Sequence, residues 1–100
     1  MLNNEIYHNQ NILVTGGAGA IGSNLSRSLA EAGAAKVIIL DDLSASYKWN
    51  IPNLPNVLFV EGSVTNDIDL KRVFHEKPTY IFHLAAFFAN QNSVDYPEKD

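Results

Sequence analysis

Three glycines spaced three residues apart are the most distinctive chemical feature of the sequence. Gly16, Gly19 and Gly22 follow a short apolar run and open a stretch with helical periodicity. The first N–H groups of a helix have no intrahelical partner and lie at the positive end of its dipole, so they attract anions. We expect Gly16 to permit a tight turn, Gly19 to let the backbone approach a pyrophosphate, and Gly22 to let the helix pack against the strand.

An acidic residue stands at the end of the apolar run that follows this glycine-rich loop. Asp41 stands about 20 residues after the glycines, at the end of the next apolar run. A carboxylate there accepts hydrogen bonds from both hydroxyls of an adenosine ribose and repels a 2′-phosphate, and no arginine follows it, so NAD is favoured over NADP. The alternative is that Asp41 is only a solubilising acid at a strand end. A Walker A loop for ATP is rejected, because "GGAGAIGS" has no lysine at the required place.

The elements that must position these residues alternate between strands and helices. Short apolar runs predict four strands, at residues 11–15, 36–40, 57–60 and 79–86. Apolar residues at Ile21, Leu25 and Leu29 predict a helix that Gly33 ends, and Thr65 is expected to cap a second helix with Ile68, Val73 and Phe74 on one side. Such alternation calls for parallel crossovers and a sheet covered on both faces.

This order of elements predicts an α/β fold, the first half of a Rossmann-like doubly wound parallel sheet. The expected strand order is 3-2-1-4, and the sheet is incomplete, because the strand with Ile81 and Phe82 is left as an unpaired edge. Residues 1–10 are polar and are interpreted as a disordered lead-in. Residues 11–100 are interpreted as the N-terminal part of a dinucleotide-binding domain whose remainder lies elsewhere.

The composition argues against several other classes of function. The chain has 100 residues and a formal net charge of −4, and its lysines and arginines are dispersed, which argues against nucleic-acid and anionic-membrane partners. No apolar stretch is long enough to span a bilayer, and the first residues are polar, so the chain is expected to be soluble and cytoplasmic. It has no cysteine, and His8, His75 and His83 lack metal-ligand spacing, so no metal site is predicted.

A family resemblance emerges from four segments taken together. The chain carries, in order, "VTGGAGAIGSNL", "ILDDLS", "EGSVTN" and "IFHLAA". Their order and spacing resemble the N-terminal half of extended short-chain dehydrogenases/reductases, with the nucleotide-sugar epimerases and dehydratases as the best likeness. The resemblance implies that the protein containing this chain is an enzyme, a homodimer that acts on a nucleotide sugar and uses NAD as a recycled cofactor.

The resemblance also implies which residues surround the cofactor. They are Gly16, Gly19, Ala20, Ile21 and Gly22 at the pyrophosphate, Asp41, Asp42, Leu43 and Ser44 at the adenosine ribose, Ser63 and Val64 at the adenine, and Leu84, Ala85 and Ala86 beside the nicotinamide ribose. The family usually has Asp where this chain has Ser63. We expect the Ser63 hydroxyl to contact the adenine amino group more weakly than a carboxylate does. Phe87 and Phe88 either line the site or fill a core or subunit interface, and His83 is interpreted as a core residue rather than a catalytic one.

The acid–base pair of the family is missing from this sequence. Family members use a tyrosine whose phenol is acidified by a lysine four residues later, and none of Tyr7, Tyr47, Tyr80 and Tyr96 has a lysine there. We therefore predict no catalytic residue in this chain, which is expected to be inactive alone. Two alternatives stay open. The protein is a simple NAD(P)-dependent reductase or dehydrogenase of the same superfamily, or the chain is a non-catalytic dinucleotide-binding or assembly fragment.

Overall fold

Four parallel strands form the centre of the computed structural model, which describes residues 4–44 and 46–84. The strands are β1 (Asn11–Thr15), β2 (Lys36–Asp41), β3 (Val57–Glu61) and β4 (Tyr80–His83). They are hydrogen-bonded in the order β3-β2-β1-β4, and every pairing is parallel. The predicted fold class and strand order are therefore confirmed.

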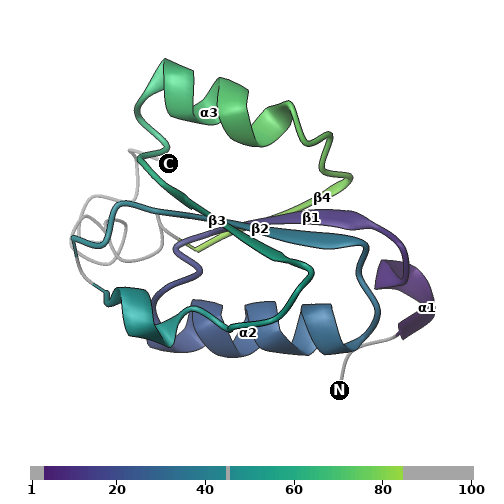
Figure 1. Ribbon diagram of the computed structural model, residues 1–100. Coiled ribbons are helices and arrows are strands. Elements are labelled where there is room, and N and C mark those ends of the chain that lie inside the picture. The colour runs from purple at the N-terminus through teal and green to yellow at the C-terminus, as the bar shows by residue number, and fades with distance from the viewer. Residues whose placement is uncertain (1–3, 45, 85–100) are drawn as a thin grey trace, which may run out of the picture.

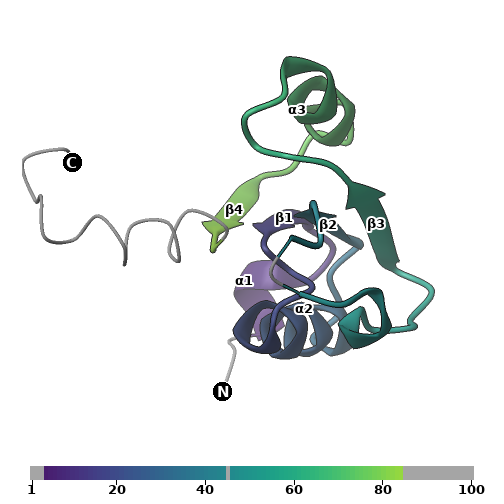
Figure 2. The same ribbon diagram turned by 90° about the vertical axis from the view of Figure 1, so that its left-hand side faces the viewer.

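Helices cover both faces of this sheet, as Figures 1 and 2 show. The helical elements are α1 (Asn4–Tyr7), α2 (Ala20–Glu31), the short 3-10 helix η1 (Lys48–Asn50) and α3 (Asp67–Phe74). In both views α2 lies on one face of the sheet and α3 lies on the opposite face. None of the described helices is long and apolar enough to cross a membrane.

The two central strands are buried on both sides. Side chains of β1 and β2 alternate between two apolar clusters, one of which includes residues of α2 and the other Val73 of α3. Ile12 and Ile39 belong to the first cluster, and Leu13 and Ile38 belong to the second. Such double burial is typical of parallel sheets and gives the carboxyl ends of β1 and β2 a rigid base.

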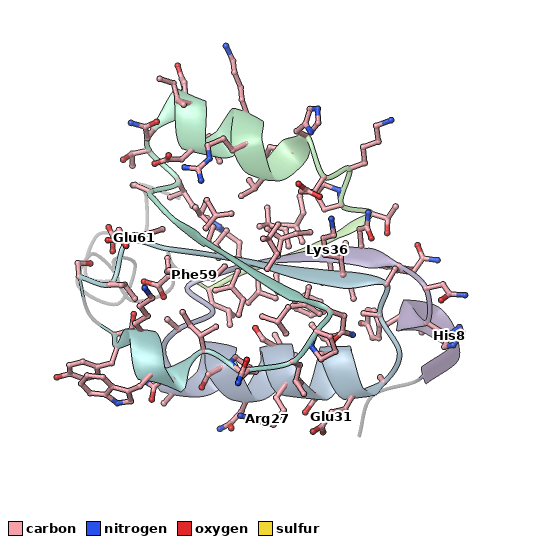
Figure 3. The ribbon with its side chains drawn as sticks, viewed as in Figure 1. His8, Arg27, Glu31, Lys36, Phe59 and Glu61 are labelled. Atoms are coloured by element: carbon pink, nitrogen blue, oxygen red, sulfur yellow. The ribbon has the colours of Figure 1, made fainter. Side chains whose placement is uncertain are left out.

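The buried face of α2 agrees with the predicted one at Leu25 and Leu29 and differs from it at Ile21. Ile21 is 62% exposed, whereas its neighbour Gly22 is buried together with Ser26, Leu29 and Ala30. At its first turn the helix approaches the glycine-rich loop with Gly22, where a side chain does not fit, and the Ile21 side chain faces outward. Figure 3 shows Arg27 and Glu31 pointing from α2 away from the sheet.

The segment before β1 is ordered from Asn4 onward, so its interpretation as a disordered lead-in is wrong for those residues. Tyr7 is the last residue of α1. Its ring packs edge-on against Tyr80 at a centroid distance of 5.2 Å, and its centroid lies 6.0 Å from that of Phe82. The N–H of Asn9 donates to the Gly33 carbonyl at 2.9 Å. These contacts attach the segment to β4 and to the end of α2, and composition alone does not reveal them.

The start of α3 also corrects an expectation. Its N-cap is Asn66, whose side chain accepts from the N–H of Asp69 at 2.9 Å, and not Thr65. The side chain of Val73 is buried, but Ile68 and Phe74 are 69% and 47% exposed. The three apolar residues of the predicted helix therefore do not share one buried face within the described part of the chain.

The last strand is shorter than predicted. β4 ends at His83, whereas the prediction placed a strand over residues 79–86. Within the described residues β4 pairs with β1 alone, and Ile81 is 51% exposed, so the predicted unpaired edge is confirmed there. Residues 85–100 lie outside the described part of the chain.

Candidate functional site

The turn from β1 into α2 is built on two glycines that no other residue replaces easily. Gly16 has a φ of +79°, in the left-handed region, and its N–H donates to the Leu40 carbonyl at 2.8 Å. A Cβ added at Gly22 lies only 2.2 Å from the Gly16 carbonyl oxygen and 2.8 Å from the Gly17 Cα. The helix therefore approaches the loop directly, so the contact predicted for Gly22 exists with the loop rather than with the strand.

Gly19, the middle glycine of the motif, has room for a Cβ and does not have a positive φ. Gly19 is the N-cap of α2, with extended φ and ψ of −75° and 175°, and it has no side chain to cap the helix. A Cβ there meets the Gly16 carbonyl oxygen at 3.5 Å, an ordinary contact. The side chains of Ala20 and Ile21 are exposed. The N–H groups of this first turn, which have no partner inside a helix, are thus open to an anion.

Sequence reasoning missed two residues of the loop. Gly17 lies against β2, where an added Cβ meets the Ile39 side chain at 2.6 Å. Ala18 is fully buried, and its N–H donates to Asp41 Oδ2 at 3.0 Å. The double glycine at the loop start was the available signal for tight packing. No sequence pattern signals the bond between Ala18 and Asp41.

Asp41 is a buried acid that accepts three hydrogen bonds from the protein, and not the solubilising surface residue of the alternative interpretation. Its side chain is at the end of β2 and is 8% exposed. Besides Ala18, the N–H of Leu43 at 2.7 Å and the hydroxyl of Ser46 at 2.9 Å donate to its Oδ1. An ionised carboxylate has about four acceptor positions, so roughly one remains for a ligand without displacing a protein group.

Asp42, the residue after Asp41, carries a second negative charge at this strand end. Hydrogen bonds from the Ser44 side chain and from its N–H, at 2.9 Å from Asp42 Oδ1, lower the pKa of the exposed Asp42. Leu43, between the two acids, has a φ of +63°, a conformation that is uncommon for leucine and is supported here by its hydrogen bond to Asp41. Two carboxylates at one strand end disfavour a further phosphate.

The segment after β3 is closed by its own hydrogen bonds. The Ser63 hydroxyl accepts from the N–H of Thr65 at 3.1 Å and lies 2.7 Å from the Thr65 hydroxyl. The N–H of Ser63 donates to Asp69 Oδ2 at 3.0 Å, a contact that sequence reasoning missed. Val64 packs against the apolar cluster on the α3 side of the sheet. The Ser63 hydroxyl is thus engaged locally, which limits its freedom to contact an adenine.

At the end of β4, His83 is exposed, so the interpretation as a core residue is wrong within the described chain. Its Nδ1 hydrogen-bonds the Thr15 hydroxyl at 2.8 Å, and the N–H of Leu84 donates to the Thr15 carbonyl at 2.9 Å. Ala85, Ala86, Phe87 and Phe88 lie outside the described residues. No group of three potential metal ligands gathers anywhere in residues 4–44 and 46–84.

Those predicted residues that lie within 4–44 and 46–84 come together at one edge of the sheet, at the carboxyl ends of the strands. The glycine-rich loop is bonded to Asp41, and the N–H of Gly62 donates to the Asp41 carbonyl at 3.1 Å. Figure 3 shows Glu61 at this edge and Lys36 at the opposite one. In an open α/β sheet, the crevice outside the carboxyl ends of the strands is where ligands bind.

Comparison with known proteins agrees with this geometry. A profile described as "NAD dependent epimerase/dehydratase family" matches residues 12–100. The UDP-glucose 4-epimerase of Streptomyces lividans is 35% identical over 89 residues, which cover 87% of this chain and 26% of that protein.

Solved structures give the same relationship. The epimerase Mth375 of Methanothermobacter thermautotrophicus is 62% identical with a TM-score of 0.82, covering 97% of this chain and 29% of that one. The Bordetella bronchiseptica enzyme WbmF, solved in complex with NAD+, is 40% identical with a TM-score of 0.72, covering 79% of this chain and 24% of that one. The chain thus spans less than a third of each relative. Because the family profile matches nearly its whole length, the chain belongs to the NAD dependent epimerase/dehydratase family.

Proposed function

We propose that this chain is the NAD-binding portion of a larger nucleotide-sugar epimerase or dehydratase. The observation that carries the proposal is the hydrogen bond from the N–H of Ala18 to Asp41 Oδ2, 3.0 Å long. It joins the glycine-rich loop before α2 to the acid at the end of β2, the two parts between which a dinucleotide lies in this kind of sheet. The complex of WbmF with NAD+ supports the same choice of cofactor.

The residues present fit the pyrophosphate of such a cofactor. The first turn of α2 offers N–H groups without a side-chain cap, at the positive end of a helix of 12 residues. The position of a Cβ on Gly19 is open apart from one ordinary contact, so a phosphate can approach the backbone closely. The N–H groups of Ala20 and Ile21 are proposed to hold it, with Gly19 leaving room for the phosphate and Gly16 and Gly22 shaping the turn.

The acids at the end of β2 fit the adenosine ribose. Asp41 has acceptor capacity left for a ribose hydroxyl, and the Ser46 hydroxyl is the one of its three donors that a side-chain rotation removes. The carboxylate of Asp42, whose pKa is lowered by its hydrogen bonds with Ser44, adds a second negative charge beside it. We therefore propose binding of NAD in preference to NADP, whose 2′-phosphate these carboxylates repel.

The chemistry follows from the cofactor and from residues outside this chain. When bound, NAD would supply the hydride acceptor and donor for a transient oxidation of a sugar hydroxyl, which allows epimerisation or dehydration. Residues of this chain bind and orient the cofactor, and we propose that a tyrosine and lysine pair beyond it moves the proton. The relation to a UDP-glucose 4-epimerase supports a nucleotide sugar as substrate and an isomerase reaction. A cytoplasmic homodimer is proposed from the family resemblance.

A titration of the full-length protein that contains this chain tests the proposal. We expect NAD to bind more tightly than NADP, and Asp41→Ala to weaken NAD binding by about 1–3 kcal/mol, roughly five- to 150-fold. Glu31→Ala is the control, because that acid is exposed at the last position of α2 and points away from the sheet, and we expect its effect to stay below about twofold. Equal binding of NADP, or an unchanged NAD affinity in Asp41→Ala, contradicts the assignment.

A further inference from the structure

The side chain of Asn50 reaches the glycine-rich loop from a distant part of the chain. Its Nδ2 donates to the Ala18 carbonyl oxygen at 3.1 Å, across 32 residues of sequence. Asn50 is the last residue of η1 and is partly buried. In Figure 1 this short teal helix lies on the same face of the sheet as α2, near the start of that helix.

With this contact, both the N–H and the carbonyl of Ala18 are hydrogen-bonded to side chains. The N–H of Ala18 donates to Asp41 Oδ2, and its carbonyl accepts from Asn50. The next N–H, that of Gly19, donates to the Gly16 carbonyl at 3.2 Å. The peptide groups on both sides of Ala18 are therefore held in fixed orientations directly before the first turn of α2.

The orientation of these peptide groups matters for an anion at that helix end. A carbonyl oxygen carries partial negative charge, whereas the free N–H groups of a helix start carry partial positive charge. We propose that Asn50 is a positioning residue for the cofactor pyrophosphate. By holding the Ala18 carbonyl toward η1, it keeps that oxygen away from the phosphates and fixes the loop before the ligand arrives. This inference rests on the proposed function.

The segment around Asn50 is anchored on both sides. On one side the Ser46 hydroxyl donates to Asp41, and on the other Ile51 packs against the apolar cluster beside α2. The N–H of Asn50 donates to the Tyr47 carbonyl at 3.0 Å. The rings of Tyr47 and Trp49 stack on each other at 4.6 Å and 9°. The position of the Asn50 amide is thus set by the fold, as a preorganised contact requires.

The decisive variant is Asn50→Asp in the full-length protein. Aspartate has nearly the shape of asparagine but only accepts hydrogen bonds, so its charge faces the Ala18 carbonyl without a proton between them. We expect the dissociation constants of NAD and ADP, which both contain a pyrophosphate, to rise about tenfold or more. The dissociation constant of adenosine, which has no phosphate, is expected to change by less than about twofold. Asn50→Ala, without the added charge, is expected to raise the NAD and ADP values about threefold to tenfold.

Asn56 provides a matched control in the same connection between β2 and β3. Its Nδ2 donates to the carbonyls of Ala30 at 3.0 Å and Ala34 at 2.9 Å, at the opposite end of α2. Asn56→Asp therefore makes the same chemical change far from the glycine-rich loop. We expect it to lower stability while leaving NAD and ADP affinity within about twofold.

The outcomes separate this inference from the function on which it rests. If the unaltered protein binds neither NAD nor ADP, the proposed function is wrong and the role of Asn50 is rejected with it. If the unaltered protein binds both, and Asn50→Asp and Asn50→Ala bind them equally well, only the role of Asn50 is overturned. A loss of adenosine binding as large as that of ADP also overturns it, because the effect is then a general loss of structure. Asn50→Ala serves as the test where the aspartate variant does not fold.

Discussion

Gly22→Ala should lower stability and Gly19→Ala should lower NAD affinity, although both replace a glycine of the same loop with alanine. A Cβ at Gly22 lies 2.2 Å from the Gly16 carbonyl oxygen and 2.8 Å from the Gly17 Cα. Both are backbone atoms, so α2 or the loop has to shift by about 1 Å to reach ordinary contact. Overpacking of this kind costs about 1–3 kcal/mol, and the alanine recovers up to about 1 kcal/mol of helix propensity. We expect a net loss of about 1–2 kcal/mol of stability.

Gly19→Ala meets no such obstacle inside the protein. Its added Cβ lies 3.5 Å from the Gly16 carbonyl oxygen, and its φ and ψ of −75° and 175° suit any residue. The gain from a stiffer unfolded chain and the loss of a favourable N-cap roughly cancel, so we expect stability to stay within about 1 kcal/mol. The new methyl group instead occupies space proposed for the pyrophosphate, and NAD affinity should fall about tenfold or more.

Chemical denaturation and NAD titration of both variants in the full-length protein make the comparison. The reasoning predicts that Gly22→Ala lowers the denaturation midpoint and that Gly19→Ala mainly raises the dissociation constant of NAD. Two results refute it. Either Gly19→Ala destabilises the protein as much as Gly22→Ala, or Gly19→Ala binds NAD as the unaltered protein does. The first result contradicts the packing of the loop, and the second contradicts the place of the pyrophosphate.

Two further predictions concern the frame around the site. Tyr7→Ala removes the ring contacts with Tyr80 and Phe82 of β4 and should cost about 2 kcal/mol of stability in chemical denaturation. The control Tyr47→Ala, at a residue that is 58% exposed, should cost less than about 1 kcal/mol. Equal losses in the two variants contradict the role of α1. The hydrogen bond from Lys36 lowers the pKa of Glu76 below its ordinary value of 4.5. A carboxyl with a lowered pKa stabilises the fold above its ordinary pKa and loses that contribution as the pH falls through the lowered value. The unaltered protein should therefore be more stable than Glu76→Gln at pH about 7, and this difference should shrink at pH about 3. A difference that is the same at both pH values argues against this ion pair.

The order of strands and helices and the glycine-rich turn between the first strand and α2 were predictable from the amino-acid sequence. Apolar runs and helical spacing are local signals, and the rules for connections in a parallel α/β sheet then leave only a few strand orders, of which 3-2-1-4 is the usual one for a Rossmann-like half. The glycine motif and Asp41 were recognisable for the same reason, because a positive φ at Gly16 and a Cβ-free contact at Gly22 restrict the residue type at those positions. The cofactor class followed from these residues together with the family resemblance.

The hydrogen bonds between distant residues at the site could not be predicted from the sequence. The bonds from Ala18 to Asp41 and from Asn50 to Ala18 join residues 23 and 32 positions apart. The spacing of apolar residues does not predict these bonds, because they depend on the paths of the connections after β1 and β2 once the two strands are paired. The same holds for the contact of Tyr7 with β4 and for the exposure of Ile21. Sequence spacing selects the elements, and the packing of their ends against each other selects the contacts.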